Sequence, residues 1–90
     1  MKIYIVKRYG TLYFSSLKKV AKHIVDEYLR IIKSHNHPVY FHSKWPNPKS
    51  WVNVGFYKIF EATLNVGETN FKEVDKELVN DAIDKCSKEI

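Results

Sequence analysis

Three histidines that lie close together in the sequence are the first residues that could do chemistry. His35, His37 and His42 fall within eight consecutive positions. A zinc site needs three or four ligands that converge on the metal, and no cysteine or carboxylate lies between or beside these histidines in the sequence. The segment therefore favours a polar connection between a helix and a strand. A metal-dependent enzyme built on the three histidines remains our third alternative for the function.

Other catalytic or phosphate-binding motifs are missing from the sequence. Cys86 falls on the apolar stripe of the last predicted helix, where a buried and unreactive thiol is expected. Ser15 and Ser16 are explained as helix caps, and the three glycines are too far apart to form a glycine-rich phosphate loop. We therefore expect a protein that is not an enzyme, with no catalytic residue, no metal and no cofactor.

Aromatic residues next to basic ones form the more informative pattern. Rings stack on bases and lysines neutralise phosphates when proteins bind single-stranded nucleic acid, while Trp and Tyr are also typical hot spots of protein interfaces. A purely structural role, in which the two tryptophans close a loop over the sheet edge, is the third interpretation. The predicted partner-binding residues are Lys7, Arg8, Tyr9, Lys44, Trp45, Lys49, Trp51, Tyr57 and Lys58.

A second basic group lies at the start of a predicted helix. Lys18, Lys19 and Lys22 fall on its first turns, where the helix dipole makes cations slightly unfavourable. A basic helix start of this kind could hold a phosphate, and a solvated helix face is the simpler alternative. We keep these three lysines as a candidate phosphate-binding group.

The first third of the chain predicts a hairpin followed by a helix. Residues 2–9 are apolar on both faces of a strand, which is typical of a central strand. Gly10 supplies a turn, and residues 12–14 pair back as a short antiparallel strand. Apolar residues then recur at helical spacing from Leu17 to Lys33, after a serine cap.

The remaining elements are predicted from similar patterns. Residues 39–43 form another short strand, and the two prolines of residues 44–51 predict an exposed loop. The alternation over residues 52–66 predicts either one long bent strand or two strands hinged near Gly55. Asn70 and Glu73 resemble a capping box for a final helix that begins near Phe71 and runs to the C-terminus.

These elements make one α+β domain over residues 1–90. The simplest architecture is an antiparallel sheet of three to five strands with two helices packed on one face. The order is strand, strand, helix, strand, strand, helix. An unpaired strand at the edge of such a sheet is compatible with a homodimer.

The formal net charge of +5 is unevenly distributed. The first 58 residues carry eleven Lys and Arg against two Asp and Glu, whereas the last 32 carry four against eight. Such a basic body favours an anionic partner on one side of the molecule. The chain shows no secretory signal and no apolar run long enough to span a bilayer, and its single cysteine suits a reducing compartment. We expect a cytoplasmic protein with no membrane partner.

The segment Lys2-Ile3-Tyr4-Ile5-Val6, followed by Gly10, Phe14-Ser15-Ser16 and a helix, resembles the start of many small accessory proteins of prokaryotic viruses and mobile elements. The Lys-, Ile-, Tyr- and Asn-rich composition is similar too. The resemblance implies a non-catalytic protein that binds a host or viral macromolecule in the host cytoplasm. Inhibitors of nucleic-acid-targeting defence systems, such as anti-CRISPR proteins, belong to this class. Many of them are acidic mimics of nucleic acid, a pattern from which the basic body of this chain departs.

The leading hypothesis is therefore a viral-type module that binds a protein partner through the basic and aromatic surface, and that acts as an inhibitor of such a defence system. The main alternative is a regulatory protein that binds DNA or RNA.

Overall fold

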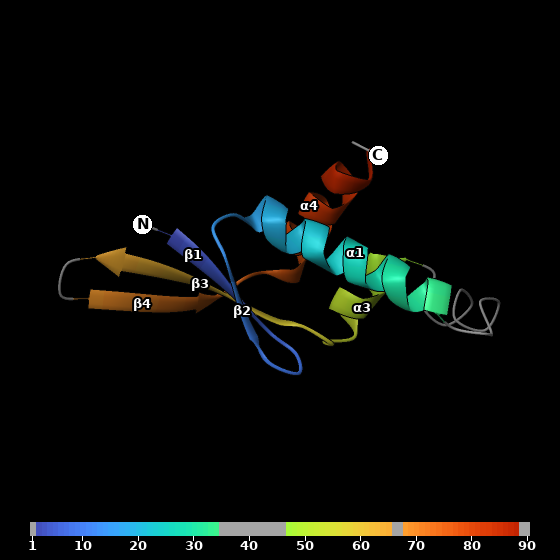
Figure 1. Cartoon of the computed structure of the whole chain (residues 1–90). Helices are drawn as coiled ribbons and strands as arrows, with labels where there is room; N and C mark the ends of the chain where they lie inside the picture. Colours follow the sequence, from blue (N-terminus) through green and yellow to red (C-terminus); the bar gives the residue numbers. More distant parts are fainter. Residues whose placement is uncertain (1, 35–46, 66–67, 89–90) are drawn as a thin grey trace.

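The computed structural model describes residues 2–34, 47–65 and 68–88, and shows a four-stranded antiparallel sheet with helices beside it (Figure 1). The strands lie in the order β2-β1-β3-β4. The predicted α+β class and its antiparallel sheet are confirmed. The described elements are β1 (Lys2–Lys7), β2 (Thr11–Phe14), α1 (Leu17–Ser34), α3 (Pro48–Asn53), β3 (Lys58–Asn65), β4 (Glu68–Glu73) and α4 (Lys76–Lys88).

The predicted hairpin and first helix are present. β1 pairs with β2 on one side and with β3 on the other, as its apolar residues on both faces predicted. The Oγ of Ser16 accepts a hydrogen bond of 3.2 Å from the backbone N–H of Lys19, so this serine caps α1. The apolar stripe of α1 is buried, with Val20, Ala21 and Ile24 fully covered.

The prediction of an exposed loop over residues 44–51 is wrong for the part that the structure describes. Residues Pro48–Asn53 form the short helix α3. Asn47 caps it by accepting a hydrogen bond of 3.0 Å from the backbone N–H of Ser50, and Pro48 occupies the first turn, where its missing N–H costs nothing. The helix turns Trp51 and Val52 into the core.

The segments after α3 also differ from the predicted boundaries. Residues 52–53 belong to α3, and a turn with Gly55 at φ 84° leads into β3, which begins only at Lys58. The predicted capping box at Asn70 and Glu73 is wrong because both residues lie in β4. The final helix begins at Lys76 rather than near Phe71.

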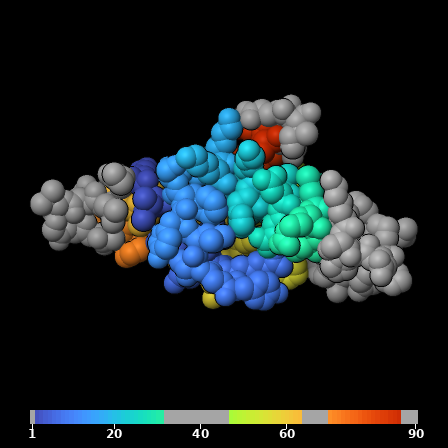
Figure 2. Space-filling model, in the orientation of Figure 1, coloured from blue at the N-terminus to red at the C-terminus, as the bar shows by residue number. Residues whose placement is uncertain are grey.

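The helices pack on one face of the sheet, mainly over β1 and β2, and leave the other face open. Residues of the sheet that join the core formed with the helices are Tyr4, Val6, Phe14 and Ile59, together with Tyr57 just before β3 and Val74 just after β4. Ile5 and Ala62 are also buried, but they lie on the opposite face and outside that core. Figure 2 shows the β1–β2 hairpin beside α1, which together make up most of that view of the surface.

Two further predictions concern a strand at residues 39–43 and the absence of a membrane-spanning segment. The strand expected at residues 39–43 lies outside the described residues. None of the helices that the structure describes has the length and apolar character needed to cross a membrane.

Candidate binding surface

One side of the sheet carries no helix. We call it the open face. Strand register places one set of residues there, because Cα partners in an antiparallel pair point to the same side. They are Ile3, Ile5 and Lys7 of β1, Thr11 and Tyr13 of β2, Lys58, Phe60 and Ala62 of β3, and Phe71 and Glu73 of β4.

Exposed aromatic side chains project from the open face. Tyr13, on the edge strand β2, is 67% exposed, and Phe71, on the edge strand β4, is 64% exposed. Ile5 lies directly between Tyr13 and Phe60, and is only 8% exposed. The rings therefore form an apolar layer whose outer side faces solvent, which on a small protein is typical of a contact surface.

Two lysines stand side by side at one end of this layer. Lys7 and Lys58 are direct cross-strand partners, and both are exposed. The Lys7 Nζ lies 5.8 Å from the centroid of the Phe60 ring. Like charges placed opposite each other destabilise a sheet, and within the described residues neither lysine has an ion pair with a carboxylate. The arrangement leaves positive charge available next to an aromatic ring.

Arg8 was predicted to bind a partner, but the structure holds most of its side chain inside the molecule. Its Nη1 forms an ion pair with Oε1 of Glu27 and donates a hydrogen bond of 3.1 Å to the hydroxyl of Tyr57. Its Cζ lies between 5.0 and 5.8 Å from the ring centroids of four aromatic residues, a cation–π arrangement. Glu27 also contacts the Nε2 of His23, 3.1 Å away. We call Arg8, Glu27 and the four rings (Tyr9, Trp51, Phe56 and Tyr57) the Arg8 cluster.

The surface placement expected for Trp51 and Tyr57 is wrong. Trp51 is 1% exposed and Tyr57 is 5% exposed, because α3 and the following turn fold both rings beneath Arg8 and α1. Lys49 is on the surface, but its Nζ pairs with Oδ1 of Asp84 at 2.9 Å and so links α3 to α4. These three residues do not extend the open face.

The structure brings only part of the predicted group together. Lys7 and Lys58 meet on the open face, and Tyr9 is 94% exposed at the tip of the β1–β2 hairpin. Lys44 and Trp45 lie outside the described residues. Tyr13, Phe60 and Phe71 were missed because the side of the sheet that the helices leave open depends on the whole set of strand pairings, although the alternation of apolar residues in β1 and β3 was a partial signal.

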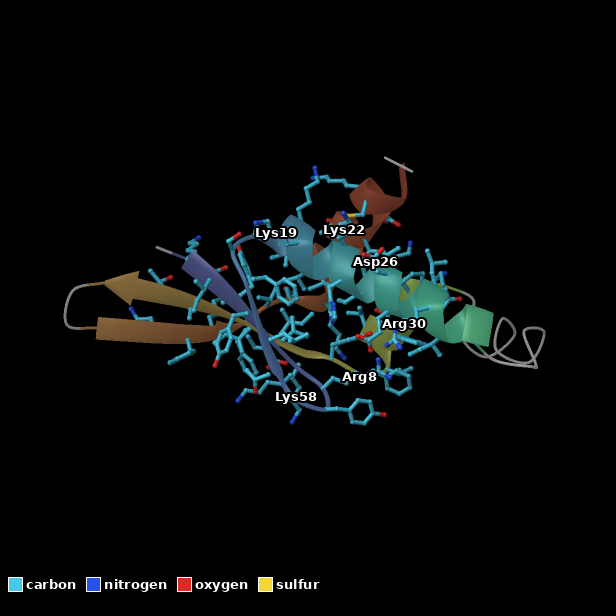
Figure 3. The ribbon with its side chains drawn as sticks, viewed as in Figure 1. Arg8, Lys19, Lys22, Asp26, Arg30 and Lys58 are labelled. Atoms are coloured by element: carbon cyan, nitrogen blue, oxygen red, sulfur yellow. The ribbon has the colours of Figure 1, made fainter. Side chains whose placement is uncertain are left out.

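The candidate phosphate-binding lysines lie elsewhere. Figure 3 shows Lys19 and Lys22 along the far side of α1 from Lys58. Lys18, Lys19 and Lys22 are all exposed. They border a hollow of about 550 Å³ that is also lined by Ser16, Val25, Asp26 and Cys86. The Nζ of Lys19 donates a hydrogen bond of 2.9 Å to Oγ of Ser15. A ligand on the open face would therefore not touch this group.

No family model, curated protein or solved structure matches this chain.

The geometry of the molecule is therefore what bears on its function. Across residues 2–34, 47–65 and 68–88, no three His, Cys, Asp or Glu side chains converge in a way that could hold a metal ion. His35, His37 and His42 fall outside those ranges. The open face is the described feature that combines exposed rings with exposed positive charge.

Burial of Tyr57 predicts a loss of stability in alkali. Burial raises the pKa of its hydroxyl above the ordinary value of 10.0, and the nearby Glu27 carboxylate raises it further. Burial raises the pKa of Tyr28 as well. The folded state then keeps these protons while the unfolded chain releases them. Stability is therefore fully retained below about pH 10, and falls above it by up to about 1.4 kcal/mol per pH unit for each phenol.

Urea unfolding of the wild type and of Tyr57→Phe from about pH 8 to about pH 11.5 measures this effect. We expect a shallower alkaline decline in the variant, which has one fewer buried phenol to titrate. The exposed Tyr13→Phe serves as a control and should keep the wild-type slope. Equal slopes for Tyr57→Phe and the wild type would contradict the prediction.

Proposed function

We propose that this chain is a small non-catalytic binding protein that engages a macromolecule through the open face of its sheet. The observation that carries the proposal is the exposure of Tyr13 and Phe71 on that face, with Lys7 and Lys58 at its end. Aromatic side chains supply large contact area at a low entropic cost, and a surface of this kind on a small protein is typical of an interaction site.

The biological setting is a further part of the proposal. The resemblance of the first third of the chain to accessory proteins of prokaryotic viruses supports a host or viral macromolecule as the partner, met in the host cytoplasm. A protein partner, bound by an inhibitor of a nucleic-acid-targeting defence system, corresponds to that resemblance. The paired lysines support the alternative of a nucleic acid. A homodimer would use the edge strand β2 or β4.

Position-specific crosslinking tests the use of the open face. A photoreactive benzophenone amino acid replaces Phe71 in one variant and Leu78 in a second. Leu78 is a matched control because it is also apolar and is 55% exposed, but it lies on α4. Irradiation in prokaryotic cells that express each variant is expected to give a discrete adduct from position 71 and none from position 78.

The adduct should also require the neighbouring rings. Combining the photoreactive group at position 71 with Tyr13→Ser is expected to reduce the adduct severalfold. Adducts of equal yield from positions 71 and 78, or none from position 71, would overturn the proposal.

A further inference from the structure

The ligand class of the open face follows from how charge and rings are placed on it. We infer that the open face binds single-stranded nucleic acid, with bases stacked on Tyr13, Phe60 and Phe71 and with phosphates held by Lys7 and Lys58. This inference rests on the proposed function, because it names the partner of the same surface.

The three rings form a line of separate stacking positions. Tyr13 is on β2, Phe60 is on β3 and Phe71 is on β4, so each ring comes from a different strand. Strand spacing puts Tyr13 and Phe60 about 10 Å apart, with Ile5 between them, and puts Phe71 about 8 Å diagonally from Phe60. A chain of a few nucleotides can cross these rings, and stacking suits any base because every base has a flat face.

Positive charge lies where the phosphates of such a strand would run. Lys7 and Lys58 stand opposite each other at the hairpin end of the face, and in the free protein the Lys7 ammonium lies over the Phe60 ring. A base that stacks on Phe60 therefore displaces this ammonium toward a phosphate. The repulsion between two opposed lysines is unfavourable in the free protein. A phosphate bound between the two lysines removes that repulsion. Relief of the repulsion therefore adds to the free energy of binding an anionic ligand.

The same charges disfavour an apolar occupant of the open face. Two copies of the chain stacked face to face would bury four ammonium groups from Lys7 and Lys58 against only two Glu73 carboxylates. Burying unpaired charge is costly. A duplex also fits poorly, because its bases are already stacked on one another and present no free flat face to the rings.

Fluorescence anisotropy with labelled dodecamers of deoxythymidine and of uridine tests the inference. We expect the wild type to bind both single strands more tightly than a duplex of the same length, and the affinity to fall steeply with salt. Phe60→Ala and Phe71→Ala are each expected to weaken binding about tenfold, the range for loss of one stacked base. The control Leu78→Ala, on α4, should leave the affinity unchanged.

Charge variants test the phosphate positions separately. Lys7→Gln with Lys58→Gln is expected to make the slope of log affinity against log salt shallower by about 1.4, because each phosphate contact on a single strand contributes about 0.7. Lys76→Gln, an exposed lysine at the start of α4, is the matched control and should keep the wild-type slope. Glu73→Gln removes the one carboxylate among the described residues that define the open face, and should strengthen binding a fewfold.

Failure of this inference differs from failure of the proposed function. Absence of oligonucleotide binding, or binding that the Phe71 and lysine variants do not change, overturns the nucleic acid assignment. If the crosslinked adduct from position 71 then resists nuclease and contains a second polypeptide, the open face still binds a macromolecule, and that macromolecule is a protein. If position 71 gives no adduct either, both proposals fall.

Discussion

Replacement of Trp51 by alanine is expected to lower the free energy of unfolding by about 3–5 kcal/mol, the usual cost of removing a large buried ring. Trp51 is 1% exposed and has the largest fully buried side chain among the residues that the structure describes. Its ring packs edge-on against Tyr28 of α1, with centroids 5.2 Å apart, and against Phe56, with centroids 5.8 Å apart. Because these contacts join α1 to α3 and the following turn, the cavity left by alanine cannot be closed by moving one side chain.

Urea denaturation followed by circular dichroism measures this change. The matched control is Phe71→Ala, which removes an aromatic ring that is 64% exposed and should cost about 0.5 kcal/mol. Trp51→Phe keeps part of the ring and should lie between the two, which provides a measurement if Trp51→Ala does not fold. Equal losses for Trp51→Ala and Phe71→Ala would show that Trp51 is not a core residue.

Trp51 also shows where prediction from the sequence reached its limit. The prolines at positions 46 and 48 were interpreted as breaking regular structure, which is their usual effect inside a helix or strand. At the first turn of a helix the same residue is favourable, and the sequence Asn47-Pro48 is a capping signal that the interpretation overlooked. Once α3 forms, its geometry directs Trp51 inward. Missing this one short helix therefore placed a core residue on the predicted surface.

Local signals were sufficient for the elements that depend on local contacts. The helical spacing after Ser16 predicted α1 within a residue of its observed end, and Gly10 marked the β1–β2 turn. β4 gave no such signal, because Phe71 is its only large apolar side chain. It becomes a strand by pairing with β3, and its pairing partner cannot be identified from its own residues.

The sequence predicted the lysines of the open face but not its rings, because long-range strand pairing decides which residues share that face. Lys7 and Lys58 were selected because each lies next to aromatic residues in the sequence, and they prove to be cross-strand partners. Alternating apolar residues indicated that both sides of β1 would be apolar. Which side the helices cover depends on the whole set of pairings, so the sequence did not show that Tyr13, Phe60 and Phe71 would share the uncovered side.

The second large effect is expected in the Arg8 cluster. The side chains of Arg8 and Glu27 are 19% and 16% exposed, and they join the β1–β2 hairpin to α1. Tyr57 and Glu27 outweigh the effect of burial, so the pKa of Arg8 is raised above its ordinary value and the guanidinium stays charged. Without Arg8, the largely buried Glu27 carboxylate loses its guanidinium partner and keeps its contact with His23. Arg8→Met is therefore expected to destabilise the fold by about 2–4 kcal/mol, slightly below the range for fully buried pairs.

A double-mutant cycle separates the ion pair from the packing of the ring-stacked guanidinium. Arg8→Met, Glu27→Gln and the double variant should give a coupling energy of about 1–2 kcal/mol by urea unfolding, because each single variant removes the same ion pair.

Arg8→Lys keeps the charge but loses the planar group that contacts Trp51 and Tyr57, so it should recover only part of the stability that Arg8→Met loses. Full recovery by lysine would mean that charge alone holds the hairpin to α1. A coupling energy near zero would mean that Arg8 and Glu27 act independently, and the hairpin would then be held by packing of the rings.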